Sequence, residues 1–318
     1  MKLFDGMHDI SVVANRATGF DVSTGVWVRS NIETNVINGL YTQDEFIKIM
    51  AGLPASCDTG TPFLEFNQRY PYPKDNVGTC GITRDFLQHI ALASATKDYR
   101  HYLNAIAFDF ESNCIIASDG HRMHVGDSAG MNGSGFYILP IVAVKKALAA
   151  KADLTIHFMN DASITHAIIV CDDIHETVIS ARTIDYQYPP YKSVIPQNGL
   201  RLGETSDILA AVKAGQSLAK KIKWKSEKNK KGAFMPCGIH FSEAGAFLVH
   251  SNKTERFQLD SANYAVSSDK QCYGYEMGYL TDIVKSAHEK SEFLIAQGSG
   301  VLLVKGLYFQ GVIMPFIL

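Results

Sequence analysis

Hydrophobic residues recur at helical spacing in five segments of the chain, and a short apolar strand closely follows three of these segments. The three helix–strand pairs are predicted at residues 42–50 with 63–66, 140–151 with 154–158, and 277–288 with 293–295. Further helices at 83–96 and 206–221 precede the second and third pairs. One theme is thus repeated three times, and the first copy lacks an opening helix.

Local signals support the predicted helices. Thr42 and Glu45 have capping-box spacing, which satisfies free backbone amides at a helix start. Pro140 suits a first helical turn, and Ser206 is a suitable N-cap. The helical spacing at 83–96 and 206–221 predicts buried positions at Phe86, Leu87, Ile90, Ala91, Ile208, Val212 and Ala219.

Several strands are predicted as well. Apolar and polar residues alternate over 154–158, which is typical of a half-buried strand. Segments 104–110 and 114–118 flank a turn and predict a pair of strands. The apolar stretch at 300–318 contains Lys305 and Gln310, so it predicts two strands and is too interrupted to span a membrane.

Turn signals divide the chain into three domains. Boundaries near residue 80 and at 197–199 define a reduced first domain at 1–80, a second at 81–198 and a third at 199–318. The predicted fold class is α+β, with repeated domains of two helices packed on antiparallel sheets and a reduced first domain.

The composition is that of an ordinary globular protein, with 46% hydrophobic and 19% charged residues. The net charge of −2 gives no global positive field for nucleic acid, although basic residues gathered on one inner face remain compatible with it. The six cysteines form no CxxC pair, and the first residues contain no hydrophobic signal-peptide core. These features predict reduced thiols and a cytoplasmic location.

Four segments carry the strongest functional signal. Residues 312–318, Val-Ile-Met-Pro-Phe-Ile-Leu, are wholly apolar, so we expect this tail to be buried against another part of the fold. Residues 117–122 read Ala-Ser-Asp-Gly-His-Arg, and residues 188–196 read Tyr-Pro-Pro-Tyr-Lys-Ser-Val-Ile-Pro. Residues 97–104 contain the run Asp-x-Arg-x-Tyr-Leu-Asn.

Together these segments resemble the bacterial sliding clamp, the β subunit of the replicative DNA polymerase. In that family a DGHR turn, an F-P-x-Y-x-x-V-x-P turn and a VMPM-type tail form one pocket for short peptides of polymerases and the clamp loader. The resemblance covers residues 81–318 well and residues 1–80 poorly. It implies a DNA-clamp fold.

The resemblance also implies which residues form the peptide pocket. Gly120 would allow a tight turn, Arg122 and His121 would offer hydrogen-bond donors, and methionine would supply an adaptable apolar wall. Ser193 and Ile317 stand where the family usually has arginine, so we expect a less basic pocket. The implied pocket residues are Leu103, Ser118, Gly120, His121, Arg122, Pro189, Val194, Val312, Met314, Pro315, Phe316 and Leu318.

A basic segment at 220–231 holds seven lysines in twelve residues. One interpretation is a solvated loop. The other is an arm that contacts DNA phosphates, with Trp224 stacking on a base or sugar. By the clamp resemblance, the expected DNA-facing residues are Arg84, Gln88, Lys97, Arg100, Lys145, Lys146, Lys151, Lys213, Lys220, Lys221, Lys223 and Lys225.

Enzymatic and metal-binding readings have less support. Asp119, His121 and His124 could be read as a metal or hydrolase site, but no convincing third ligand is near them in sequence. A nucleophile elbow, a P-loop and a GxGxxG–helix motif are absent from the sequence. We therefore expect no catalysis, no cofactor and no metal.

The sequence leaves two functional hypotheses. The first is a clamp-like processivity factor that encircles duplex DNA without sequence preference and docks a polymerase and a clamp loader through short peptides. It would be a homo-oligomeric ring, with a dimer favoured, and would have no membrane contact. The alternative is a clamp-derived peptide-binding adaptor that does not encircle DNA.

Overall fold

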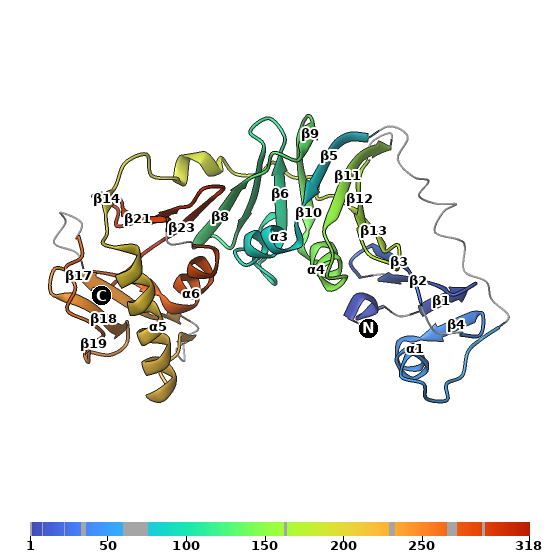
Figure 1. Cartoon of the computed structure of the whole chain (residues 1–318), viewed down its shortest axis with the longest axis horizontal. Helices are drawn as coiled ribbons and strands as arrows, with labels where there is room; N and C mark the ends of the chain where they lie inside the picture. Colours follow the sequence, from blue (N-terminus) through green and yellow to red (C-terminus); the bar gives the residue numbers. More distant parts are fainter. Residues whose placement is uncertain are drawn as a thin grey trace. The chain divides into compact units, whose positions relative to one another are not determined.

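The computed structural model describes residues 2–7, 9–21, 23–32, 36–59, 76–161, 164–228, 233–265, 272–287 and 290–318. The ribbon is shown in Figure 1. The chain forms two compact units, the first made of Met1–Ile116 with Asp127–Tyr188, the second of Ala117–Gly126 with Pro189–Leu318. The strand predicted at 63–66 lies outside the described residues.

The first unit contains an antiparallel sheet that joins the beginning of the chain to its middle. Strand β3 pairs with β13 in the register Val28↔Ile179, so residues far apart in sequence share one hydrogen-bonded sheet. The strand β5 spans the boundary expected near residue 80. In spatial order the strands are β4 (Gly39–Thr42), β1 (Asp9–Val13), β2 (Arg16–Asp21), β3 (Val26–Asn31), β13 (Val178–Arg182), β12 (Ile164–Cys171), β11 (Leu154–Asp161), β5 (Asn76–Ile82) and β9 (Met131–Gly133).

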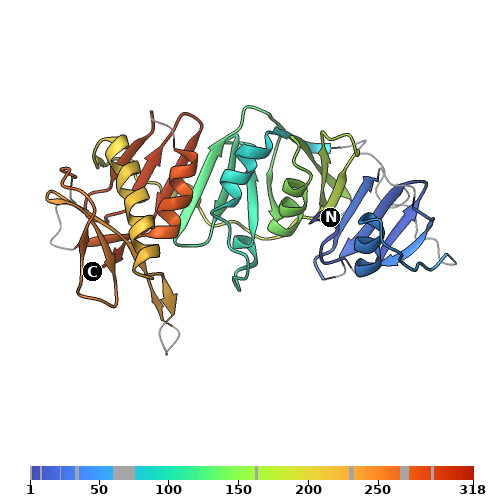
Figure 2. The ribbon, with the colours of Figure 1, turned by 60° about the horizontal axis from the view of Figure 1, so that its bottom comes forward.

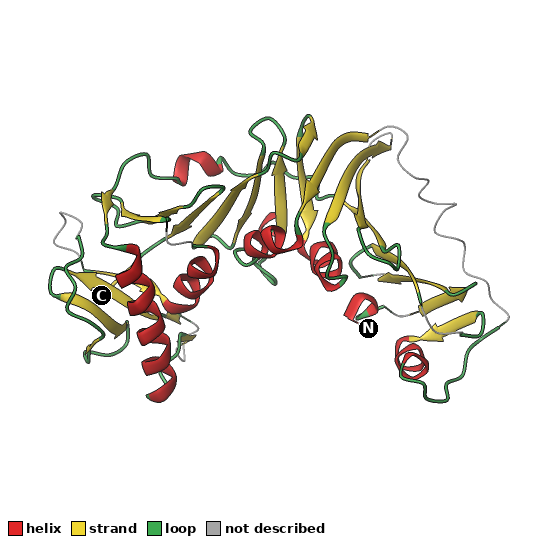
Figure 3. Ribbon diagram, in the orientation of Figure 1, coloured by secondary structure: helices red, strands yellow, loops and turns green. Residues whose placement is uncertain are grey.

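Shorter elements complete the first unit. Figure 3 shows its helices α3 and α4 beside one another on one side of the strands. Phe108 and Phe158 come from different sheets, are both fully buried, and have ring centroids 5.2 Å apart. The remaining elements are η1 (Lys2–Phe4), α1 (Gln43–Met50), α3 (Arg84–Ala91), η2 (His101–Leu103), β6 (Ala105–Asp109), β7 (Cys114–Ser118), β10 (Phe136–Pro140) and α4 (Ile141–Ala149).

In its described residues, the second unit has two α-helices and two larger groups of strands. Figure 2 shows α5 (Thr205–Lys221) and α6 (Met277–Ser286) side by side, and Gln216 donates a 2.6 Å hydrogen bond to Thr281 between them. Its strands are β8 (Arg122–Asp127), β23 (Phe309–Ile313), β22 (Leu302–Lys305), β21 (Glu292–Ile295) and β14 (Leu200–Arg201) in one group, and β19 (Phe257–Gln258), β18 (Gly245–His250), β17 (Cys237–Ser242), β20 (Tyr273–Glu276) and β24 (Phe316–Ile317) in the other. The hairpin β15 (Glu227–Lys228)–β16 (Phe234–Met235) and η3 (Tyr191–Val194) complete it.

Most predicted elements are confirmed. The capping box at α1 is present, since the Glu45 amide donates to the Thr42 hydroxyl and the Glu45 carboxylate accepts from the Thr42 amide. The helices at 140–151 and 277–288 correspond to α4 and α6. Leu87, Ile90, Ile208, Val212 and Ala219 are buried as expected, whereas Phe86 and Ala91 are half-buried.

Three local predictions are wrong. The helix α3 ends at Ala91 rather than near 96, because the Ser94 amide and hydroxyl both donate to the Ala91 carbonyl and close the last turn. Ser206 is not the N-cap of α5. That position belongs to Glu204, whose carboxylate instead pairs with Arg201 at 2.9 Å. The 300–318 stretch forms a third short strand, β24, after β22 and β23.

Lys146 is a further correction. We expected it to face DNA, but it is only 6% exposed, and its ammonium donates to the carbonyls of Asp5 at 2.6 Å and Leu3 at 3.4 Å. Burial lowers the pKa of the Lys146 ammonium, although the carboxylates of Asp21 and Asp5 oppose that shift. Lys146 therefore fastens η1 to α4 and has no free charge to offer a phosphate.

We predict that Lys146→Met destabilises the first unit. The change leaves two carbonyls of the η1 region without their buried donor, which should cost about 1–3 kcal/mol of unfolding free energy. Urea denaturation followed by circular dichroism measures it. The control is Lys145→Met, because Lys145 is the exposed neighbour on the same helix and its replacement should leave the midpoint nearly unchanged. Equal effects of the two variants would contradict the fastening role.

Candidate functional site

The turn at residues 118–122 is built by its own polar side chains. Ser118 donates to the Arg122 carbonyl at 2.7 Å and accepts from the Gly120 amide at 3.0 Å. The Asp119 carboxylate accepts from the amides of His121 at 2.9 Å and Arg122 at 3.0 Å. Gly120 has a φ of +91°, a conformation that side chains disfavour. The sequence Ser-Asp-Gly-His-Arg therefore forms a rigid turn that exposes Gly120 and His121.

Arg122 is committed to carboxylates within the second unit. Its Nε lies 3.0 Å from an oxygen of Asp119, and its Nη1 lies 2.7 Å from an oxygen of Asp282 on α6. Its guanidinium also lies 4.6 Å from the ring centroid of Tyr279. The side chain is 11% exposed. We expected Arg122 to donate to a peptide, but these contacts give it the role of holding the turn against α6.

Two residues of this cluster, Asp282 and Tyr279, were not predicted from the sequence. Asp282 is half-buried and bridges Arg122 and Lys285, the latter at 2.8 Å. Burial alone would raise the pKa of the Asp282 carboxyl, but hydrogen bonds from Lys285 and Arg122 hold that pKa below its ordinary value. Burial, with the charges of Asp119 and Glu276, raises the pKa of Tyr279 to about 12. Both side chains thus keep their ordinary charge states at neutral pH.

The tail is only partly buried, which corrects the expectation for the whole heptapeptide. Val312 and Ile313 are buried in β23, which pairs with β8 and β22. Val312 therefore belongs to the core rather than to an exposed wall. Beyond β23, Met314 is 43% exposed and Ile317 is 63% exposed.

Hydrogen bonds fix the exposed part of the tail. The Met314 amide donates to the His121 carbonyl at 2.9 Å, so the tail is attached directly to the turn. The strand β24 then pairs with β20, and the Leu318 amide donates to the Cys272 carbonyl at 3.0 Å. We call residues 118–122 together with 314–318 the turn–tail surface.

Two glycines make room for the ring of Phe316. A Cβ added at Gly274 would come within 2.5 Å of the Phe316 ring, and one added at Gly238 would come within 3.0 Å of it. The ring therefore lies close over two glycines, and a larger residue at Gly274 would push it away. Pro315, Phe316 and Leu318 are half-buried, so they present apolar surface in fixed positions.

A shallow cavity adjoins the end of the tail. It has a volume of about 490 Å³ and is lined by Leu318 and by the loop that follows β18, including Lys253 and Arg256. Lys253 also lies over the ring of Trp224, at 4.7 Å from its centroid. The surroundings of Leu318 are therefore more basic than the replacements at Ser193 and Ile317 suggested.

The other expected pocket residues have different surroundings. Leu103 is buried in η2 of the first unit. Pro189 and Val194 are exposed in the second unit, at the two ends of the turn around η3, where the Ser193 hydroxyl donates to the Pro190 carbonyl at 2.7 Å. The turn–tail surface thus accounts for nine of the twelve expected residues once Val312 is counted as its support.

The residues that we expected to face DNA differ in their exposure and in their ion pairs. Gln88, Lys97, Lys145, Lys151, Lys213, Lys220, Lys221, Lys223 and Lys225 are exposed. Arg100 pairs with Asp98 at 2.9 Å and Arg84 with Asp85 at 3.2 Å, so both are half-buried and partly neutralised. Trp224 is 9% exposed and packs in a cluster with Ala219, Cys237 and Leu248. It is therefore a core residue and is not available to stack on a base.

No metal centre is formed among the described residues, which contain no group of three histidine, cysteine, aspartate or glutamate side chains placed to hold an ion. His121 is exposed, whereas His124 is fully buried with its ring edge-on to Phe309 at 5.0 Å. The His-x-x-His spacing therefore does not bring two rings to one site. None of the described helices is long and apolar enough to cross a membrane.

Comparison with known proteins identifies the fold. No protein-family model and no curated protein matches the sequence. Among solved structures, a Helicobacter pylori beta clamp bound to a DNA ligase peptide has a TM-score of 0.66 and 14% identity, over 98% of this chain and 92% of that one. A Pseudomonas aeruginosa DNA polymerase sliding clamp has a TM-score of 0.63 and 17% identity, over 99% of this chain and 93% of that one. A putative DNA polymerase III beta subunit from Eubacterium rectale has a TM-score of 0.62 and 14% identity, over 99% of this chain and 92% of that one. The expected α+β DNA-clamp fold is confirmed.

Proposed function

We propose that this protein is a sliding-clamp-like processivity factor that docks partner peptides on its turn–tail surface and encircles duplex DNA. The observation that carries the proposal is the hydrogen bond from the Met314 amide to the His121 carbonyl. It joins two of the four segments, 117–122 and 312–318, that gave the sequence its resemblance to clamps. The fold shared with bacterial clamps supports the same proposal.

The turn–tail surface has the chemistry of a peptide dock. Met314 offers an exposed, adaptable apolar side chain, and Phe316 offers a fixed aromatic one. Gly120 leaves backbone accessible beside the exposed His121. A few fixed polar groups next to apolar walls are what peptide and small-ligand sites require. In our proposal, Arg122 acts by holding the turn in shape, and the protein performs no catalysis.

We predict that a Gln-Leu-Ser-Leu-Phe peptide binds this surface with micromolar affinity. Burying two bulky apolar side chains contributes about 3–6 kcal/mol before ordering costs, and backbone hydrogen bonds of the peptide must supply the rest of the roughly 8 kcal/mol that a dissociation constant of about 1 μM requires. Met314→Glu should weaken binding at least about tenfold, because it places a charge where an apolar side chain must bury. Isothermal titration calorimetry measures the affinity.

The matched control for this peptide experiment is Leu307→Glu. Leu307 is 81% exposed in the same unit and belongs to neither segment of the surface. Its substitution introduces the same charge and should leave peptide affinity unchanged. If Met314→Glu and wild type bind the peptide equally, the tail has no part in the site.

The exposed lysines of α5 are the proposed DNA contacts of the second unit. Lys213 and Lys220 are seven residues apart and thus share a face of the helix, while Ile208 and Val212 are buried. Contacts of ammonium groups with phosphates are independent of sequence and individually weak, which suits a protein that slides.

We predict that charge reversal of Lys213, Lys220 and Lys221 to glutamate weakens association with duplex DNA. The slope of log affinity against log salt should fall in magnitude by about three, because fewer counterions are released. Fluorescence anisotropy over a salt series measures the slope. Reversal of Lys48, Lys192 and Lys290, which are exposed elsewhere, is the control for net charge. Equal slopes for the two triple variants would remove α5 from the DNA face.

We further propose that the chain assembles head to tail into a closed ring, with a dimer favoured, because a heterologous contact makes a ring when its rotation closes. Native mass spectrometry should then give twice the 35.0 kDa of one chain. A particle of one chain at every concentration up to about 10 μM would contradict the ring and favour the adaptor that docks peptides without encircling DNA.

A further inference from the structure

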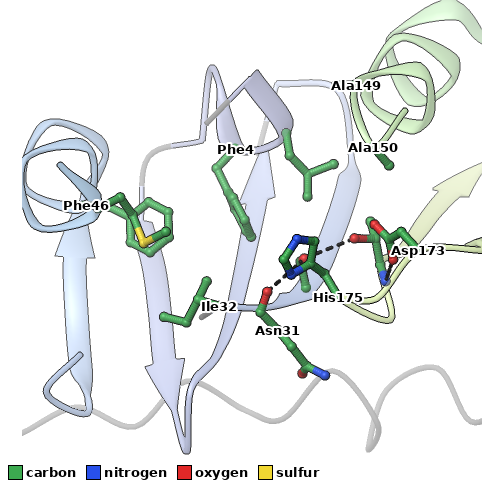
Figure 4. A pocket seen from close by; sticks show the side chains of 12 residues that line it. Phe4, Asn31, Ile32, Phe46, Ala149, Ala150, Asp173 and His175 are labelled. Carbon is green, nitrogen blue, oxygen red and sulfur yellow. Dashed lines mark hydrogen bonds between the residues drawn. The ribbon is translucent and has the colours of Figure 1, made fainter. Parts of the chain in front are cut away.

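A second cavity, in the first unit, lies far from the turn–tail surface in sequence. It has a volume of about 460 Å³, within the usual range of about 300–1,000 Å³ for small-molecule sites. Its walls come from η1, α1, β3, the end of α4 and the turn at 172–177. Figure 4 shows Phe4, Ile32, Phe46, Asp173 and His175 around this space.

One side of the cavity is apolar and tightly packed. Phe4, Ile32 and Phe46 are 5%, 9% and 2% exposed, and the rings of Phe4 and Phe46 meet edge to face at 5.2 Å. The half-buried Met50 adds a flexible thioether to the same wall. With Phe4, Ile32 and Phe46 packed behind it, the apolar surface open to a ligand comes mainly from the half-buried Leu3 and Met50, against which an aromatic or branched aliphatic group can bury.

The opposite side is polar and held in place by hydrogen bonds. Asp173 accepts from the Thr177 amide at 2.8 Å, which fixes its carboxylate. The hydroxyls of Thr177 and Ser30 lie 3.0 Å apart, and the Asn31 amide donates to the His175 carbonyl at 2.7 Å. These bonds join β3 to the 172–177 turn, so the polar wall is preformed rather than assembled by a ligand.

The lining contains one carboxylate and the imidazole of His175, and a carboxylate favours a cationic ligand group. Asp173 is a carboxylate among the lining residues, which include no lysine and no arginine. Ala149 and Ala150 line the cavity at the C-terminal end of α4, where the helix dipole is negative. Both Asp173 and these alanines are half-buried, so a charged group can reach them while its solvent side stays hydrated.

We propose that this cavity is a binding site for an arylalkylammonium, with the aromatic group against Leu3 and Met50 and the ammonium on Asp173. The proposal is independent of the clamp-like function. A ligand bound there would link η1, α1, β3 and α4, and would therefore stabilise the first unit against unfolding.

The probes are 2-phenylethylammonium, the neutral 2-phenylethanol and the anionic 3-phenylpropanoate. The methyl resonance of Met50, identified by its loss in Met50→Leu, reports occupation in full-length protein labelled at methionine methyls. The ammonium probe should shift this resonance saturably, with a dissociation constant of about 0.1–1 mM. The alcohol should bind about tenfold more weakly and the carboxylate more weakly still.

Variants separate the site from its surroundings. Asp173→Asn keeps an oxygen for the Thr177 amide but removes the charge, and should weaken the ammonium probe about tenfold. Asp172→Asn makes the same charge change at the exposed neighbour outside the lining and should have no effect. Ala149→Phe fills the cavity and should abolish the shift. The proposal is overturned if Met50 does not respond, if the carboxylate probe binds as tightly, or if the two aspartate variants behave alike.

Discussion

The pairing of β23 with β8 is the constraint on which the turn–tail surface depends. Its register sets Val312 opposite Met123 and Ile313 opposite Arg122, so the strand that leads into the tail begins beside the 118–122 turn. A slip of one residue would move the buried side chains of Val312 and Ile313 to the opposite faces of the sheet and out of their packing positions, so the register is fixed. The Met314–His121 hydrogen bond then follows from the ladder that precedes it.

Two devices keep this surface both exposed and fixed. Arg122 is tied to Asp119 in its own turn and to Asp282 on α6, so the turn is fastened to a helix of its own unit. Phe316 rests over Gly238 and Gly274, which hold a large ring close to the sheet. An apolar segment that would otherwise fray or collapse can thus remain partly exposed, which docking of a peptide requires.

Local sequence signals predicted much of the fold. The capping box at Thr42, the alternation in β11 and the buried positions of α5 depend on neighbouring residues, and the structure has all three. The outcomes for Lys146 and Trp224 depended on distant partners. The sequence suggests that Lys146, a lysine on a helix, is exposed, but it is buried against the carbonyls of the η1 region. It suggests the same of Trp224, which lies in a lysine-rich segment, but this side chain packs against β17 and β18.

The site was predicted in part for the same reason. The motifs at 117–122 and 312–318 are local and could be read directly, whereas Asp282 is 160 residues from its partner Arg122. No spacing rule links residues at that distance in one sequence. The exposure of Met314 and Ile317 likewise depends on the register in which β24 pairs with β20. The apolar composition of the tail did not indicate that register.

Retention on DNA with blocked ends tests the central claim most directly. Labelled protein is allowed to thread onto linear duplex DNA biotinylated at both ends, streptavidin then blocks the ends, and the complex is washed with concentrated salt. An encircling protein remains bound, because phosphate contacts are screened but the topological link is intact. It is then released when a restriction enzyme cuts the duplex. Equal loss from blocked and open DNA in the salt wash would contradict the account.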